Sequence, residues 1–373
     1  MNVALALARP MRHAEFAALM PALLRLRRVD IDADRHLLTC VDTDGDDAQH
    51  LLTHELDRMG VDWRVKDASS PAPVHTQGAQ VLTARGPGAR ELALPLVEKL
   101  AAWGAELRAT RCLSTAGAEM DAFELYVDGV NADAAPREEL LGLAAQWQVD
   151  LALTDADMKR PRRRLLVFDM DSTLVRCEVI DELAARAGVG DAVAAVTARA
   201  MRGELDFRSS FRERLARLQG LPETVLEEVA RSLPIMSGAP RLFRTLRAQG
   251  HYTAILSGGF DFFARRVQQE LNIDEVHSNR LQLENGVLTG DVDGPIVDGD
   301  RKEELLREIA RGQGFSMQDT VAVGDGANDL PMLSAAGLGV AFHAKSVVRE
   351  RAAVAINHSD LTGLLTLLGV PGP

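Results

Sequence analysis

The chain has 373 residues, a length that indicates two or three domains. Its net charge of −12 and pI near 5.3 argue against a nucleic-acid partner, and it has no apolar run of the roughly 18 residues that a membrane span needs. The N-terminal apolar run is too brief for a signal peptide, and Cys40, Cys112 and Cys177 have no metal-binding or disulfide spacing. We therefore expect a cytoplasmic protein with reduced thiols and no membrane contact.

Residues 1–75 carry weak patterns. EFAALMPALLRL and DAQHLLTHELDRMG predict helices, whereas HLLTCVDT and VDWRVKD predict strands. The region is interpreted as a further α+β domain, and whether it is a degenerate copy of the domain that follows is left open. SSPAPVHTQG, residues 69–78, is rich in Pro and Ser and predicts a linker.

Residues 79–157 show a clearer alternation of predicted strands and helices. QVLTAR predicts a strand, ARELALPLVEKLAAWG a helix that stops at Gly104, ELRATRCLS and AFELYVDGV two strands, APREELLGLAAQWQ a helix and VDLALTD a strand. This βαββαβ order is the split βαβ arrangement with an antiparallel sheet.

The βαββαβ region resembles an ACT domain, a regulatory module that often pairs across dimers and binds amino acids. The resemblance implies a homodimer and an amino-acid effector, with serine as the candidate, at the turn Gly86-Pro87-Gly88. The alternative for that turn is a turn without a ligand.

Residues 160–373 follow the basic hinge MKRPRRR and alternate strands with helices. RLLVFDMD, YTAILSGG and TVAVGDGAND each predict an apolar strand that ends in a polar loop. This alternation predicts an α/β fold with a doubly wound parallel sheet, in which the three loops converge beyond the carboxyl ends of the strands. Residues of about 177–248 predict a helical cap over that edge.

The first polar loop, FDMDST, places Asp169 and Asp171 directly after a buried strand. Two carboxylates so close together need a cation or a shared proton, and Mg²⁺ is the hard cation that oxygen ligands suit. The alternative is a loop that caps the next helix through Ser172 or Thr173.

The other two loops and one lysine add phosphate-binding chemistry. Ser257-Gly258-Gly259 predicts a hydroxyl and unobstructed backbone N–H groups for phosphate oxygens, or else a plain glycine-rich turn. In GDGAND, from Gly324 to Asp329, two more carboxylates follow the end of a predicted strand. The alternative is a calcium-type turn or an Asx turn. Lys302 opens a helical pattern and is either a solvated residue or the cation that offsets phosphate charge.

Taken in order, DxDST, Ser-Gly-Gly, Lys and GDGxND resemble the haloacid dehalogenase superfamily of phosphotransferases. The resemblance implies an aspartyl-phosphate on the nucleophile Asp169, with Asp171 as general acid and then general base. It further implies Mg²⁺ as the cofactor, and it implies which residues bind the phosphate and which bind the metal. The phosphate cradle is Ser257, Gly258 and Lys302; the metal ligands are Asp169, the Asp171 backbone carbonyl and Asp325; Asn328 and Asp329 support them.

Within the predicted cap, CEVIDELAARAG and RGELDFRSSFRER resemble phosphoserine phosphatases. The resemblance implies that Glu178 binds the substrate ammonium group, that Phe207 makes an apolar contact and that Arg214 binds the carboxylate. The implied reaction is hydrolysis of O-phospho-L-serine, the last step of serine biosynthesis. The alternatives are a phosphatase or phosphotransferase for another small phosphorylated amino acid, such as phosphohomoserine, and an amino-acid sensor without activity.

Overall fold

The computed structural model describes residues 3–7, 13–23, 28–32, 37–41, 46–66, 80–114, 120–130, 134–159 and 162–370. The predicted linker, residues 69–78, lies outside these ranges, as do residues 160 and 161 of the predicted hinge. The chain forms two compact units. The first comprises Met1–Pro161, Asn357–Ser359 and Gly363–Pro373, and the second comprises Arg162–Ile356 and Asp360–Thr362.

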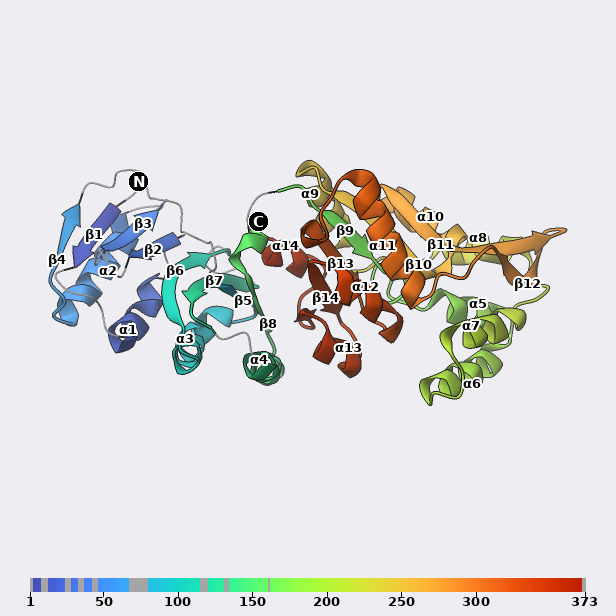
Figure 1. Cartoon of the computed structure of the whole chain (residues 1–373), viewed down its shortest axis with the longest axis horizontal. Helices are drawn as coiled ribbons and strands as arrows, with labels where there is room; N and C mark the ends of the chain where they lie inside the picture. The colour runs from blue at the N-terminus through green and yellow to red at the C-terminus, as the bar shows by residue number, and fades with distance from the viewer. Residues whose placement is uncertain are drawn as a thin grey trace. The chain divides into compact units, whose positions relative to one another are not determined.

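In the first unit, the order βαββαβ occurs twice, and the order expected for residues 79–157 is confirmed (Figure 1). The first copy also contains two strands that the sequence analysis did not anticipate, β1 and β2. The elements are β1 (Val3–Leu7), α1 (His13–Leu23), β2 (Arg28–Asp32), β3 (Leu37–Val41), α2 (Asp46–Arg58), β4 (Trp63–Lys66), β5 (Gln80–Gly86), α3 (Ala93–Ala102), β6 (Glu106–Cys112), β7 (Asp121–Asp128), α4 (Ala134–Trp147), β8 (Asp150–Asp155) and, near the C-terminus, α14 (Gly363–Leu367).

The eight strands of this unit form one antiparallel sheet in the order β4-β1-β3-β2-β6-β7-β5-β8. The two copies join through the pairing of β2 with β6, in which Val29 lies opposite Thr110. All four large helices cover one face, because their buried leucines pack in one core with inward residues of the strands. That core includes Leu19, Leu52, Leu96, Leu140, Leu5, Val29, Leu82 and Phe123.

The second unit contains a seven-stranded sheet in the order β12-β11-β10-β9-β13-β14-β15, parallel except for the β11–β12 pair. This arrangement confirms the expected α/β fold class. The elements are β9 (Leu165–Phe168), α5 (Val179–Arg186), α6 (Gly190–Met201), α7 (Phe207–Ala216), α8 (Glu223–Arg231), α9 (Ala239–Ala248), β10 (Tyr252–Phe260), α10 (Asp261–Leu271), β11 (Glu275–Glu284), β12 (Val287–Asp293), α11 (Gly299–Gln313), β13 (Thr320–Gly324), α12 (Leu330–Ala335), β14 (Leu338–Phe342), α13 (Ser346–Arg351) and β15 (Val354–Ile356).

The strand order sets the location of the site. The first strand, β9, lies at the centre, and the chain then extends the sheet through β10 on one side and through β13 on the other. Helices α9 and α10 contact each other, and so do α11 and α12. The first pair connects strands on one side of β9 and the second pair leads to strands on the other side, so right-handed crossovers put the two pairs on opposite faces of the sheet. The order therefore reverses beside β9, where open α/β sheets bind ligands.

The predicted helical insertion, residues 177–248, is helical, but its last helix lies on the sheet. Phe243 of α9 packs against Phe168 of β9 with ring centroids 4.9 Å apart. We therefore assign α5–α8 to the cap and α9 to the layer that covers the sheet. Among the described residues, the structure has no helix long and apolar enough to cross a membrane.

Candidate active site

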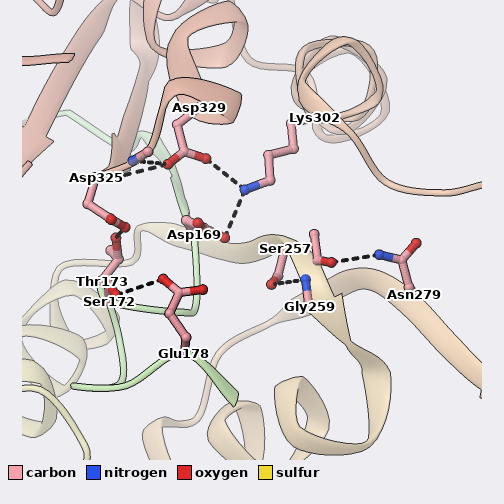
Figure 2. A network of polar contacts seen from close by, with 12 residues as sticks. Asp169, Ser172, Thr173, Glu178, Ser257, Gly259, Asn279, Lys302, Asp325 and Asp329 are labelled. Carbon is pink, nitrogen blue, oxygen red and sulfur yellow. Dashed lines mark hydrogen bonds and ion pairs between the residues drawn. The ribbon is translucent and has the colours of Figure 1, made fainter. Parts of the chain in front are cut away.

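Asp169 is the first residue after β9, a strand whose four residues are all buried. Its backbone N–H donates to the Val323 carbonyl at 2.9 Å, so the loop is tied to the neighbouring strand β13. Asp169 is 6% exposed, and its Oδ1 lies 2.8 Å from Nζ of the fully buried Lys302 (Figure 2). The central strand thus presents a carboxylate, with a cation beside it, at the carboxyl edge of the sheet.

Asp325 and Asp329 enter the same cluster from the loop after β13. The Thr173 hydroxyl donates to Asp325 Oδ1 at 3.0 Å. Asp329 is completely buried, and both of its oxygens have donors: Oδ1 accepts from Lys302 Nζ at 2.7 Å, and Oδ2 accepts the backbone N–H groups of Asp325 and Gly326 at 3.1 and 2.9 Å (Figure 2). Asp329 therefore positions Lys302 and the Asp325 loop.

The cluster is short of positive charge. Side-chain oxygens of Asp169, Asp325 and Asp329 lie within 4.8 Å of one another, with Lys302 as the ammonium group in contact with two of them. Burial, and then the charge of Asp329, raises the pKa of Asp169 to about 7; burial, and then Asp169 and Asp329, raises the pKa of Asp325 to about 8. Burial would lower the pKa of Lys302, but the two aspartates outweigh it and raise that pKa.

These residues fit a hard divalent cation. Buried carboxylate oxygens are the ligands that such ions prefer, and a bound cation would relieve the repulsion that raises the two pKa values. Because both oxygens of Asp329 are already hydrogen-bonded, Asp169 and Asp325 are the carboxylates that remain to hold the ion. The chemistry of this donor set favours an oxygen-ligated metal such as Mg²⁺.

Asp171 differs from Asp169 in its surroundings. Its Oδ1 accepts the Val179 N–H at 2.9 Å, at the start of α5. Burial, and then the charges of Glu178 and Asp169, raises the pKa of Asp171 well above its ordinary value. A carboxyl group that keeps its proton beside an ionised neighbour can serve as a general acid.

The glycine loop of β10 lies directly against this acid and against the cap. The Ser257 hydroxyl accepts the Gly259 N–H at 2.9 Å. A Cβ atom added at Gly259 would lie 2.5 Å from Asp171 Oδ2, and one added at Gly258 would lie 2.9 Å from the Phe207 ring. Glycine at both positions leaves room for an acid and a cap residue to approach the backbone.

The cap contains two predicted site residues of opposite charge, Glu178 and Arg214. Glu178 is exposed and accepts a hydrogen bond from the Ser172 hydroxyl at 2.9 Å. Arg214 is half-buried on α7; burial lowers its pKa, while the charges of Glu178, Asp181 and Asp171 act in the opposite direction. These two residues could bind the ammonium and carboxylate groups of an amino acid.

The structure thus brings most of the predicted residues together in one unit. Asp169, Lys302 and Asp325 are joined through ion pairs and Asp329, and Asp171, Gly259, Gly258 and Phe207 form a contiguous row. Asn328 lies in the same loop as Asp325, with its side-chain oxygen beside Gly326. The carboxylate of Asp171 is outside the group of three that lie within 4.8 Å of one another, so its expected metal contact would be its backbone carbonyl.

Two residues that contribute to the site were not predicted from the sequence. Thr173, considered there only as a helix cap, holds Asp325, and Asn279 of β11 donates to the Gly258 carbonyl at 2.8 Å (Figure 2). Thr173 was detectable as part of the FDMDST motif. Asn279 carried no local signal, because it is a single polar residue in a strand between two motifs.

Comparison with known proteins agrees with this geometry. A family model described as haloacid dehalogenase-like hydrolase matches residues 166–334. A phosphoserine phosphatase of Archaeoglobus fulgidus is 44% identical over 254 residues, which are 68% of this chain and 74% of that protein. The phosphoserine phosphatase of Haemophilus influenzae is 47% identical over 221 residues, 59% of this chain and 70% of that one. The unliganded structure of a probable phosphoserine phosphatase from Vibrio cholerae superimposes with a TM-score of 0.63 and 33% identity over 81% of this chain and 90% of that one.

The parallel sheet, the carboxylates at its carboxyl edge and the matching family model define a haloacid dehalogenase-like hydrolase. The cap of this chain carries Glu178 and Arg214. Within this class, the chain belongs to the phosphoserine phosphatase family.

Proposed function

We propose that this protein hydrolyses O-phospho-L-serine to L-serine and phosphate through an aspartyl-phosphate on Asp169. The observation that carries the proposal is the contrast between two neighbouring carboxyl groups. The ammonium of Lys302 contacts Asp169 and acts against the burial that raises the pKa of Asp169, whereas burial and the charges of Glu178 and Asp169 raise the pKa of Asp171 well above its ordinary value. One is suited to attack phosphorus and the other to donate a proton.

In the first step, an oxygen of Asp169 forms a bond to phosphorus as the bond from phosphorus to the serine oxygen breaks. The protonated carboxyl group of Asp171 gives its proton to that leaving oxygen. In the second step, water attacks phosphorus, Asp171 takes up a proton from it, and the bond between Asp169 and phosphorus breaks. Phosphate is released, and both side chains return to their starting states.

Charge on the phosphoryl group is offset from two directions. Lys302, Ser257 and the backbone at Gly258 would form the phosphate cradle, and Asn328, in the loop of Asp325, would support it. Mg²⁺ held by Asp169, Asp325 and the Asp171 carbonyl would add positive charge at the transferring phosphoryl group. These groups also explain how an acidic protein binds an anionic substrate.

The serine part of the substrate would lie beneath the cap. Glu178 would bind its ammonium group and Arg214 its carboxylate, and Phe207, which lies against Gly258, would make an apolar contact with it. Two charges of opposite sign beside a phosphate site match a phosphorylated zwitterionic amino acid.

The test is a screen of phosphate release from O-phospho-L-serine, O-phosphohomoserine, other phosphorylated metabolites and p-nitrophenyl phosphate. We expect O-phospho-L-serine to have the highest kcat/KM, EDTA to abolish turnover and added Mg²⁺ to restore it. If another ester were preferred, or if EDTA had no effect, the substrate or the metal assignment would be wrong.

The reaction would complete serine biosynthesis in the cytoplasm, and the free thiols of Cys112 and Cys177 are compatible with a reducing compartment. The doubled βαββαβ arrangement of the first unit supports an ACT-like role, with an amino-acid effector and a homodimer. Calorimetry of the full-length protein with L-serine, before and after substitutions in the Gly86–Gly88 turn, would test effector binding.

A further inference from the structure

Asn279 is a buried amide whose two ends bind two different backbone segments. It lies on β11, is 2% exposed, and donates from Nδ2 to the Gly258 carbonyl at 2.8 Å. Its Oδ1 accepts the Val297 N–H, also at 2.8 Å. Figure 2 shows the first of these contacts next to Ser257 and Gly259.

The Gly258 carbonyl depends on Asn279 because the strand ladder is interrupted there. β10 pairs with β11 as far as Leu256 opposite His277, and pairing resumes with Phe260 opposite Asn279, with a register shift in between. A bulged strand leaves peptide groups without their ladder partners, and a buried carbonyl without a donor is destabilising. The Asn279 side chain supplies the donor that the ladder no longer provides.

This hydrogen bond also determines the orientation of a peptide group in the phosphate cradle. In a planar trans peptide, the carbonyl of Gly258 and the N–H of Gly259 point in opposite directions. The carbonyl is held by Asn279, and the N–H donates to the Ser257 hydroxyl at 2.9 Å. Asn279 therefore acts on the Ser257 hydroxyl through one rigid peptide plane.

The other end of Asn279 leads to Lys302. Val297 directly precedes Asp298, which caps α11: its side chain accepts the Arg301 N–H at 3.0 Å, and its carbonyl accepts the Lys302 N–H at 2.9 Å. One amide thus links the bulge of β10 to the first turn of the helix that carries the buried lysine.

We propose that Asn279 is a positioning residue that sets the spacing between the Ser257–Gly259 loop and Lys302, so that both contact the same phosphate group. The inference rests on the proposed function for the identity of the substrate, but not for the presence of a phosphate site. The residues that this link joins include neither Glu178 nor Arg214, the two residues proposed to bind the amino-acid end of the substrate.

The experiment compares Asn279→Ala with the wild type in Mg²⁺, measuring the inhibition constants of inorganic phosphate and of L-serine, kcat/KM for O-phospho-L-serine, and the unfolding midpoint. We expect the phosphate constant to rise about tenfold and kcat/KM to fall about tenfold, because phosphate contacts are kept in the transition state. We expect the L-serine constant to stay within about twofold, since its contacts are elsewhere.

Thr253→Val is the matched control. Thr253 is 4% exposed at the other end of β10, and its hydroxyl bonds to Asp274 at 2.9 Å, so the variant removes a buried hydrogen bond from the same strand. It should lower the unfolding midpoint and leave both inhibition constants unchanged. If Asn279→Ala does not fold, Asn279→Ser supplies the same readouts with a smaller polar side chain.

A purely structural role for Asn279 would lower the midpoint while the phosphate constant stayed within about twofold of wild type, and this result would overturn the proposal. Equal shifts of the phosphate and L-serine constants would also overturn it, because they indicate general distortion. If the wild type did not hydrolyse O-phospho-L-serine at all, the proposed function would fail, and calorimetry with inorganic phosphate would still decide the role of Asn279.

Discussion

The chemistry of the site depends on how burial is distributed among a few carboxyl groups. Asp169, Asp325 and Asp329 share one buried cluster, yet their partners differ: Asp329 has its oxygens occupied by donors, while Asp169 shares Lys302 with it. Asp171, in the same loop, has its pKa raised well above the ordinary value by burial and then by the charges of Glu178 and Asp169. Neighbouring carboxyl groups thus acquire different roles from their environments.

Asp169→Asn should abolish turnover without unfolding the protein. The amide is isosteric and removes one of three clustered negative charges, while Lys302 keeps its contact with Asp329. We expect kcat to fall by at least roughly a thousandfold, as for other nucleophile substitutions. Phosphate release and a thermal melt without metal are the measurements, and near-normal release from a pure variant would refute the nucleophile assignment.

Arg214→Ala should impair O-phospho-L-serine far more than p-nitrophenyl phosphate, which has no carboxylate to bind. Losing charged hydrogen bonds to a carboxylate should lower kcat/KM for phosphoserine by about 10- to 100-fold. Arg217→Ala, an exposed arginine at the end of the same helix, is the control and should change little. Equal losses on both substrates would show that Arg214 does not bind the serine carboxylate.

At the scale of elements, the cap meets the sheet layer through a charged contact near the active site. Arg208, in the first turn of α7, lies with Nε 2.5 Å from Asp298 Oδ2, and the other oxygen of Asp298 caps α11. Next to it, Phe207 of the same turn lies against Gly258. The contact thus joins the start of a cap helix to the start of the helix that carries Lys302.

The Arg208–Asp298 pair should help to hold the cap closed. We expect Arg208→Gln to raise KM for phosphoserine about threefold at low salt, with the difference lost at high salt, because an exposed pair is weak and screened. Asp298→Asn keeps an acceptor for the helix cap. If the pair is the cause, the double variant will match either single variant; additive effects would show that the two residues act independently.

The strands also differ in how clearly the sequence predicts them. The strands β9, β10 and β13 were predictable because each is an apolar run followed by a polar, glycine-containing loop. The strands β1 (VALAL) and β2 (RVDID) were not predicted, because neither is an apolar run that ends in such a loop. Asn279 was missed for a related reason: its partners, Gly258 and Val297, are brought to it only by the register of the folded sheet.

At the scale of the whole chain, residues near the C-terminus belong to the first unit rather than the second. The carboxylate of Asp150, at the start of β8, accepts the backbone N–H groups of residues 357, 358 and 359 at 2.6, 3.0 and 2.9 Å. Arg85 of β5 donates to the hydroxyl of Thr366 in α14 at 2.7 Å. No local pattern predicted these contacts, because they join positions more than 200 residues apart in sequence.

The centre of these contacts is a buried ion pair on the sheet face opposite the four large helices α1–α4. Glu124 of β7 is completely buried, and Lys159 Nζ lies 2.8 Å from its carboxylate and donates to the Thr366 carbonyl at 3.0 Å. The Tyr126 hydroxyl donates to the same carboxylate at 2.9 Å, and burial, then Glu124, raises the pKa of that hydroxyl. Lys159 therefore neutralises Glu124 and holds the C-terminal helix at once.

Lys159→Met should destabilise the first unit by about 3–5 kcal/mol, because it leaves Glu124 buried without its closest cation. The three tryptophans of the chain, Trp63, Trp103 and Trp147, all lie in this unit, so their fluorescence reports its unfolding by urea while phosphoserine hydrolysis reports the second unit. We expect the fluorescence midpoint to fall well below that of wild type. Lys99→Met, which removes an exposed pair with Glu139, should leave that midpoint nearly unchanged. Equal midpoints for the two variants would mean that the buried pair contributes no more than a surface pair does.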